Sequence, residues 1–302
     1  MLMSIFGIPL SGADICGFMQ NTNEELCTKW HFVGAFYPFS RNHNGGQIAQ
    51  EPYVWSATAQ AHMRDAIKLK YSLVRYYYTS LFDISTRGEG TFYKPLFFEF
   101  PEDPQATLNI SSNVMLGSAL KLSINSDNTT RNYTDFYFPE GLWCRLSGNT
   151  SGENCFQAPA KGIVKNYTSG LADYQLHLRE GYIVPMQNTS TKKFSTTKDL
   201  QGWPVEFHIL GNPDVSGVWS AEGRYVNDDG LNLDLNGTVN SYDLLAYYDG
   251  ISAITVKFTM DETATKGTVT PDGCYSVNRN DFVSAFTFHN AKAFGLNKDL
   301  QA

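Results

Sequence analysis

The 302-residue chain has no clustered positive charge and no long hydrophobic run. Its 23 Lys and Arg stand against 30 Asp and Glu, for a net charge of −7, and they form no basic run or stripe. Neither a nucleic-acid partner nor an anionic membrane surface is therefore expected. No apolar stretch reaches the roughly 18 residues that suggest a membrane span. Repeats and low-complexity tracts are also missing, and 42% hydrophobic and 14% aromatic residues indicate a folded globular protein.

Cysteine is scarce, and its spacing is not that of a metal site. The five cysteines include no CxxC pair and no Cys/His cluster with zinc-ligand spacing, so we expect neither a metal ion nor a cofactor. Ten residues lie between Cys16 and Cys27, and ten also lie between Cys144 and Cys155, while Cys274 is left over. These local pairs favour two disulfides in an oxidising compartment over five free thiols.

The compartment expected from the sequence is the secretory pathway, with the lysosome, an acidic vacuole or the extracellular space as destination. Glycosylation sequons occur at seven positions, namely Asn109, Asn128, Asn132, Asn149, Asn166, Asn188 and Asn236. The opening MLMSIFGIPL has the apolar character of a signal peptide, but no basic residue precedes Lys29. A truncated buried strand is the favoured interpretation of this opening.

The first 90 residues alternate short apolar strands with helices. Residues 22–39 predict an amphipathic helix in which Thr22 and Glu25 form a capping box, and residues 56–88 predict a second helix with a buried stripe that includes Ile67. The strand segments FGIPLSGAD and FYPFSRNHN each end in polar residues. This βαβα order predicts parallel strands with the chemistry at their carboxyl ends.

After residue 90 the helical period disappears. Short aromatic and β-branched segments follow one another, punctuated by Gly, Asn, Asp or Pro, from TFYKPLFFEF to AITVKFTM. Strands at this spacing predict two β-sandwiches in series. The predicted fold is α/β plus all-β, with the end of a (β/α)8 barrel at 1–90, a proximal sandwich at 91–186 and a distal sandwich at 187–302. Since two βα units cannot close a barrel, we expect the rest of it upstream of Met1.

The segments FGIPLSGADICGF, NEELCTKWHFVGAFYPFSRNHN and QEPYVWS resemble glycoside hydrolase family 31, in particular its lysosomal acid α-glucosidase and maltase group. YYYTSLF, KPLFFEFP, YFPEGLWCRL, LHLREGYIVPMQ and NDDG continue the likeness over about the first 230 residues. The resemblance implies retaining hydrolysis of α-glucosidic bonds by two aspartates, on a (β/α)8 barrel followed by two β-sandwich domains.

The family's nucleophile and acid/base motifs, similar to WIDMNE and GDVWSS, do not occur in this sequence. We therefore assign no catalytic residue to the chain and expect it to be inactive alone. Its expected partners are an α-glucoside or oligosaccharide and the missing barrel segment.

The resemblance implies roles for individual residues. Phe18 and His43 match sugar contacts, Asp14 and Arg41 match the shell that supports them, and Cys16 with Cys27 matches a disulfide after the seventh strand. Asp14 is also a candidate to cap the next helix or to pair with Arg41, and a structural role for His43 stays open.

Two further features have ordinary structural explanations. Asp228, Asp229 and Gly230 form a carboxylate pair, but Asp-Asp-Gly is also a common tight turn, which we favour. The aromatic residues Trp143, Trp203, Tyr247 and Tyr248 could form a sugar platform, but packing in a sandwich core is favoured.

Two functions remain in competition. The chain is either the C-terminal part of a retaining α-glucosidase that removes terminal α-linked glucose from maltose- or glycogen-type oligosaccharides, or a non-catalytic carbohydrate-binding or interaction protein derived from this family.

Overall fold

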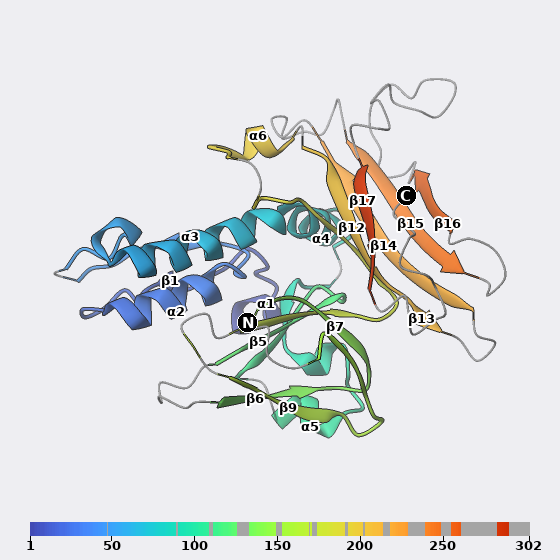
Figure 1. Ribbon diagram of the computed structural model, residues 1–302, viewed down its shortest axis with the longest axis horizontal. Coiled ribbons are helices and arrows are strands. Elements are labelled where there is room, and N and C mark those ends of the chain that lie inside the picture. The colour runs from blue at the N-terminus through green and yellow to red at the C-terminus, as the bar shows by residue number, and fades with distance from the viewer. Residues whose placement is uncertain are drawn as a thin grey trace. The chain divides into compact units, whose positions relative to one another are not determined.

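The computed structural model divides the chain into two compact units, whose elements are labelled in Figure 1. Unit 1 comprises residues 1–70 and 87–179, and unit 2 comprises residues 71–86 and 180–302. The structure describes residues 1–46, 48–88, 90–108, 111–125, 133–148, 153–168, 170, 174–190, 193–201, 203–213, 218–228, 239–248, 255–260 and 283–289.

The first part of unit 1 contains two short parallel strands and the helices that follow them. Its elements are α1 (Leu2–Ile5), β1 (Asp14–Ile15), α2 (Glu24–Gly34), β2 (Arg41–Asn42), the 3-10 turn η1 (Pro52–Val54) and α3 (Ala57–Ser72). Helices α2 and α3 run side by side (Figure 1) and enclose a small core of Ile15, Cys16, Cys27, Ala59 and Met63. The predicted parallel βα order is confirmed by the pairing of β1 with β2.

Several local predictions for this part are wrong. Residues 2–5 form a single helical turn with three exposed apolar side chains, instead of a buried strand. Asn23, not Thr22, caps α2, because its Oδ1 accepts the Leu26 N–H at 2.9 Å. Glu25 is not part of a capping box and instead pairs with Lys29 one turn later.

The second predicted helix is two helices. α3 ends at Ser72, Leu73 interrupts the helix, and α4 (Val74–Arg87) begins at once. Ile67 is 43% exposed, so it does not belong to the buried stripe that the sequence predicted.

The second part of unit 1 is a β-sandwich, as predicted. Its strands are β3 (Tyr93–Lys94), β4 (Asn113–Leu116), β5 (Leu120–Ile124), β6 (Tyr133–Phe138), β7 (Gly141–Gly148), β8 (Cys155–Ala158), β9 (Ile163–Thr168) and β10 (Tyr174–Arg179), with η2 (Leu96–Phe98) and α5 (Pro104–Leu108). Six strands form one sheet in the order β3-β4-β5-β10-β7-β8, and β6 pairs with β9. The segment TFYKPLFFEF, predicted as a strand, is extended only at β3.

Aromatic side chains fill the space between these two sheets. Phe138 of β6 contacts the rings of Trp143 on β7 and Phe156 on β8, with centroids 5.9 and 4.9 Å apart. All three side chains are 7% exposed or less. Trp143 also donates its indole N–H to the Pro139 carbonyl, which satisfies its only polar group.

Unit 2 combines helices α4 and α6 (Thr197–Gln201) with a seven-stranded sheet. The strands are β11 (Tyr182–Met186), β12 (Val205–Leu210), β13 (Asn212–Pro213), β14 (Trp219–Asn227), β15 (Asn240–Tyr248), β16 (Thr255–Met260) and β17 (Val283–Phe288). The main order is β16-β15-β14-β11-β12-β17, with β13 paired to β14.

This sheet curls over its own hydrophobic face. β16 and β17 are the two end strands, about 24 Å apart if the sheet were flat. Yet Phe258 of β16 and Phe286 of β17 have ring centroids 6.3 Å apart, and both rings contact Phe207 of β12. One curled sheet therefore encloses the core that the sequence assigned to a distal sandwich.

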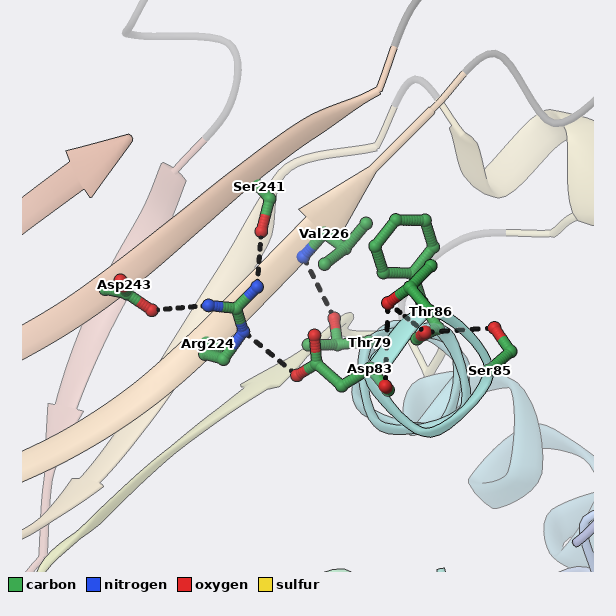
Figure 2. A network of polar contacts seen from close by, with 9 residues as sticks. Thr79, Asp83, Ser85, Thr86, Arg224, Val226, Ser241 and Asp243 are labelled. Atoms are coloured by element: carbon green, nitrogen blue, oxygen red, sulfur yellow. Dashed lines mark hydrogen bonds and ion pairs between the residues drawn. The ribbon is translucent and has the colours of Figure 1, made fainter. Parts of the chain in front are cut away.

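Polar contacts attach α4 to the sheet within unit 2 (Figure 2). Arg224 of β14 forms ion pairs with Asp83 of α4 at 2.9 Å and with Asp243 of β15 at 2.6 Å. Thr79 accepts the Val226 N–H at 3.0 Å. Arg224 is 16% and Asp83 22% exposed, so their ion pair is shielded from water better than an ordinary surface pair, whereas Asp243 is 57% exposed.

The proposed division at residues 90 and 186 stays a prediction. The compact units separate elsewhere, since α4 belongs with the distal sheet and β11 pairs with β12 and β14. No helix in the described part of the chain is both long and apolar enough to cross a membrane.

Candidate functional site

The polar residues at the ends of β1 and β2 meet because the two strands are parallel and in register. Asp14 is the partner of Arg41, and Ile15 is the partner of Asn42. The Arg41 guanidinium donates to Asp14 Oδ1 through Nη2 at 2.6 Å and Nε at 3.1 Å. Of the roles left open for Asp14, the structure thus shows the pair with Arg41.

A close backbone approach brings these strand ends together. Phe39 donates its N–H to the Ser11 carbonyl, and a Cβ at Gly12 would lie 1.9 Å from the Phe39 carbonyl oxygen. Only glycine fits there. The glycine in the SGAD segment therefore has a packing reason that is separate from any contact with a ligand.

Phe18 and His43 project from the loops that follow the two strands. Their ring centroids are 5.2 Å apart, with the planes inclined by 38°. Phe18 is 46% exposed, and His43 is exposed as well. Gly45 joins the two loops, since its N–H donates to the Phe18 carbonyl at 2.8 Å and its α-carbon lies against the Phe18 ring. The two residues therefore present a shared face to solvent.

Asn42 and Gln50 hold the loop after β2 through side-chain hydrogen bonds, a role that the sequence interpretation missed. Asn42 Nδ2 donates to the Gln50 carbonyl at 3.0 Å, and Gln50 Nε2 donates back to Asn42 Oδ1 at 2.8 Å and to the Ile15 carbonyl at 3.2 Å. Gln50 is 3% exposed. Asn42 lies in the segment RNHN and Gln50 in QEPYVWS, so both belong to segments that carry the family resemblance. The sequence alone does not indicate that their side chains are close to each other.

Both predicted disulfides are present. Cys16 is bonded to Cys27, which ties the end of β1 to α2, and Cys144 is bonded to Cys155 across the paired strands β7 and β8. Cys274 lies outside the described residues.

His31 lies beside the first disulfide. Cys16, Cys27 and His31 form the only group of three potential metal ligands that is close enough among the described residues. The sulfurs are bonded to each other, and His31 Nδ1 lies 2.8 Å from the Cys27 carbonyl. Burial lowers the pKa of His31, which keeps the ring neutral and structural.

The carboxylates of residues 1–46 all have partners. Asp14 pairs with Arg41, and Glu25 pairs with Lys29. Glu24 accepts both the backbone N–H and the hydroxyl of Ser56. Each of these three carboxylates thus has a polar contact within unit 1.

Most of the alternative sugar-site residues that the structure describes have structural contacts. Asp228 accepts a hydrogen bond from the Tyr78 hydroxyl, while Asp229 and Gly230 lie outside the described residues. Trp143 is fully buried in the sandwich core, as predicted. Trp203 is half-buried against Phe194. Tyr247 is 38% exposed, so the core packing predicted for it is wrong, and the side chain of Tyr248 is not described.

Two of the seven sequons lie on described residues. Asn166 and Asn188 are both exposed, although Asn166 Nδ2 donates to Asp135 at 2.7 Å. The other five sequons, at 109, 128, 132, 149 and 236, fall outside the described residues. Occupancy of every sequon stays a prediction.

Two family models match the chain in succession. Residues 1–80 match the glycosyl hydrolases family 31 TIM-barrel domain, and residues 89–184 match the glycosyl hydrolase family 31 C-terminal domain. The predicted fold class, a barrel end followed by β domains, is thereby confirmed.

Individual proteins agree with these models. Lysosomal alpha-glucosidase of Mus musculus is 37% identical over 229 residues, which covers 72% of this chain but only 24% of that protein. Probable maltase-glucoamylase 2 of Homo sapiens is 36% identical over 235 residues, covering 78% of this chain and 9% of that protein. The chain thus spans about a quarter or less of the length of these relatives.

A solved structure supports the same fold. The glucosidase II alpha subunit, crystallised with DNJ bound, superimposes with a TM-score of 0.73 at 24% identity, covering 88% of this chain and 28% of that one.

Proposed function

Because the chain belongs to glycoside hydrolase family 31, we propose that it provides the glucose-facing end of a retaining α-glucosidase. In this proposal the enzyme removes terminal α-linked glucose from maltose- or glycogen-type oligosaccharides. The nucleophile and the acid come from the remaining barrel strands, and this chain contributes substrate contacts and the β domains that support them.

The observation that carries the proposal is the exposed pair of Phe18 and His43. An aromatic ring offers an apolar face to the C–H groups of a sugar, and an imidazole can donate or accept a hydrogen bond with its hydroxyls. The pair lies just beyond the carboxyl ends of β1 and β2, where α/β barrels carry their chemistry. Hydrogen bonds hold the strand ends beside this pair, between Asp14 and Arg41 and between Asn42 and Gln50.

The surface of the first part of unit 1 favours a further barrel segment as partner. Of the eighteen large hydrophobic side chains that are exposed among the described residues, thirteen lie within residues 1–54. Leu2, Phe6 and Leu10 are 69%, 78% and 60% exposed. Apolar exposure on this scale marks an interaction surface. We propose that the strands and helices that complete the barrel cover it.

The proposed route is through the secretory pathway to a lysosome, an acidic vacuole or the exterior. Two disulfides are typical of proteins that mature in an oxidising compartment. The lysosomal relatives agree with that route.

The first test measures hydrolysis of an aryl α-glucoside by the purified chain. We expect no turnover above background, since the family's nucleophile and acid/base motifs do not occur in this sequence. Turnover that disappears on mutating a carboxylate of this chain would place the catalytic pair here and overturn the division of roles.

The second test uses the polypeptide in which this chain is joined to the complete barrel. His43→Ala should lower kcat/KM by roughly ten- to a hundredfold, mainly through kcat, because hydrogen bonds to the sugar tighten in the transition state. Phe18→Ala should act mainly on KM, since substrate and transition state feel an apolar contact about equally.

Phe98→Ala and His62→Ala are the matched controls. Phe98 is a 44% exposed phenylalanine of η2, outside the site and outside residues 1–54, and His62 is a half-buried histidine of α3. Both variants should retain the parent kinetics. If His43→Ala and Phe18→Ala melt like the parent and also keep its kcat and KM, the site is wrong and the resemblance concerns architecture alone.

A further inference from the structure

Two histidines far apart in the sequence meet on the outer face of the curled sheet in unit 2. β12 and β17 are parallel neighbours, with His208 opposite Thr287 and Ile209 opposite Phe288. Phe207 and Phe286 stack on the inner face, so His208, one residue after Phe207, and His289, three residues after Phe286, turn to the opposite face. The Ile209 carbonyl accepts the His289 N–H at 2.8 Å, which holds the end of β17 in place.

The imidazole nitrogens of these two residues face each other. His208 Nδ1 lies 3.1 Å from His289 Nε2, and the rings are stacked with centroids 5.4 Å apart. His208 has a side-chain exposure of 16%, and His289 is also partly exposed. Two nitrogens at this distance either share a proton or bind one cation between them.

Glu206 lies near the other nitrogen of His208. Its Oε2 is 3.8 Å from His208 Nε2, and its Oε1 accepts the Thr287 hydroxyl at 2.8 Å. A carboxylate on that side favours the tautomer with the proton on Nε2. The lone pair of His208 Nδ1 is then directed toward His289. A histidine that faces a carboxylate through one nitrogen and a metal ion through the other is a recurring arrangement in metal sites.

We propose that His208 Nδ1 and His289 Nε2 bind a divalent transition-metal ion of the Zn²⁺ type, with Glu206 as the residue that orients His208. At a Zn–N distance of about 2.0–2.1 Å, nitrogens 3.1 Å apart subtend roughly 100° at the ion, close to a tetrahedral angle. Imidazole nitrogen suits Zn²⁺, Cu²⁺ and Ni²⁺ better than Ca²⁺ or Mg²⁺, which prefer oxygen. Water completes the coordination from the partly exposed side.

The surroundings support this geometry. Both rings are at least partly buried, and burial favours the neutral imidazole that a metal ion binds. The site belongs to unit 2, whereas Phe18 and His43 belong to unit 1, so it does not depend on the proposed glucosidase function. His208 and His289 are 81 residues apart in the sequence, so a search for short metal-binding motifs does not find the site.

The test is calorimetric titration of the EDTA-treated, untagged chain with ZnCl₂ at pH 7.5. We expect saturable binding of one Zn²⁺ per chain. His208→Ala and His289→Ala should each abolish it, and Glu206→Gln should weaken it by about tenfold, the lower end of what loss of an orienting partner costs. His62→Ala is the matched control and should bind like the parent. Absence of saturable binding in the parent, or equal binding by all the variants, overturns the proposal.

A second measurement keeps the test decisive if an alanine variant fails to fold. Electron paramagnetic resonance of the parent chain with one equivalent of Cu²⁺ counts the coordinated nitrogens through their hyperfine splitting. Two imidazole nitrogens are expected, and the signal should be unchanged in His62→Ala. A spectrum with one nitrogen or none shows that the two histidines share only a proton, and the metal site is then rejected.

Discussion

Two of the histidine–phenylalanine pairs in the described part of unit 1 share their residue types and differ in almost everything else. His43 and Phe18 have ring centroids 5.2 Å apart and are both exposed. His177 and Phe138 have centroids 4.8 Å apart and are both fully buried. The residue types and the ring separation are nearly the same. Access to water separates a pair that can meet a ligand from a pair that can only pack.

The surroundings of His177 show what burial does to such a pair. Its Nε2 lies 3.4 Å from the Tyr167 hydroxyl, and Lys121, its partner on the adjacent strand, is fully buried too. The Lys121 ammonium donates to Asn113 and Ser123 and lies 3.8 Å from the centre of the Phe138 ring. Burial, followed by the nearby positive charges, holds the pKa of His177 well below its usual range. His177 is therefore a neutral packing residue.

The largest expected effect tests this comparison directly. Phe138→Ala leaves a cavity between the two sheets, beside Trp143 and His177, and should lower the free energy of unfolding by about 3–5 kcal/mol. Phe18→Ala removes an exposed ring and should change it by about 0.5 kcal/mol or less. Urea unfolding followed by tryptophan fluorescence measures both. Equal losses would mean that Phe18 is a core residue, and the contrast between the clusters would disappear.

Two Arg–Asp pairs extend the comparison to electrostatics. Arg224→Met removes the ion pairs of a side chain that is 16% exposed and leaves Asp83 without them, so it should cost about 1.5–3 kcal/mol. Arg41→Met breaks a pair whose arginine is 52% exposed and should cost less than about 1 kcal/mol. Thermal melts in low and high salt provide the measurement. A larger loss for Arg41 would show that the β1–β2 pair supports the fold as well as the site.

The pH dependence of stability tests the burial of His177. His177 is neutral in the folded chain and binds a proton in the unfolded chain below its usual pKa near 6.5. Because the unfolded state then holds more protons, stability should fall as the pH drops below about 6.5, by up to about 1.4 kcal/mol per pH unit. In His177→Gln this slope should be shallower than in the parent. Urea unfolding at pH 7.5, 6 and 5 gives the slope, and identical slopes would assign acid sensitivity to other groups.

The smallest expected effect concerns the start of α2. Asn23→Ala removes the acceptor of the Leu26 N–H and should cost about 1 kcal/mol. Thr22→Ala should stay within about 0.5 kcal/mol, because Thr22 is not the cap. Hydrogen exchange at the first turn of α2 reports the local loss. A greater effect of Thr22→Ala would restore the capping box that the sequence predicted.

Much of the candidate site could be predicted because its signals are local in the sequence. The SGAD and RNHN segments predicted strand ends that meet, and the structure pairs Asp14 with Arg41. The paired spacing of the cysteines predicted both disulfides. The errors were also local, since Asn23 and Thr22 are both common cap residues and the backbone geometry selects Asn23.

The sequence by itself determined the order of the elements, the parallel strands and the family, because periodicity and short motifs act between neighbouring residues. Only the tertiary structure decided which histidines face water. It also decided that β16 and β17 close over one core and that His208 meets His289 across 81 residues. Burial is the sum of contacts from segments distant along the chain, so no local window of sequence contains it. The same imidazole can thus be a proposed sugar contact at 43, a packing residue at 177 and half of the proposed metal site at 208.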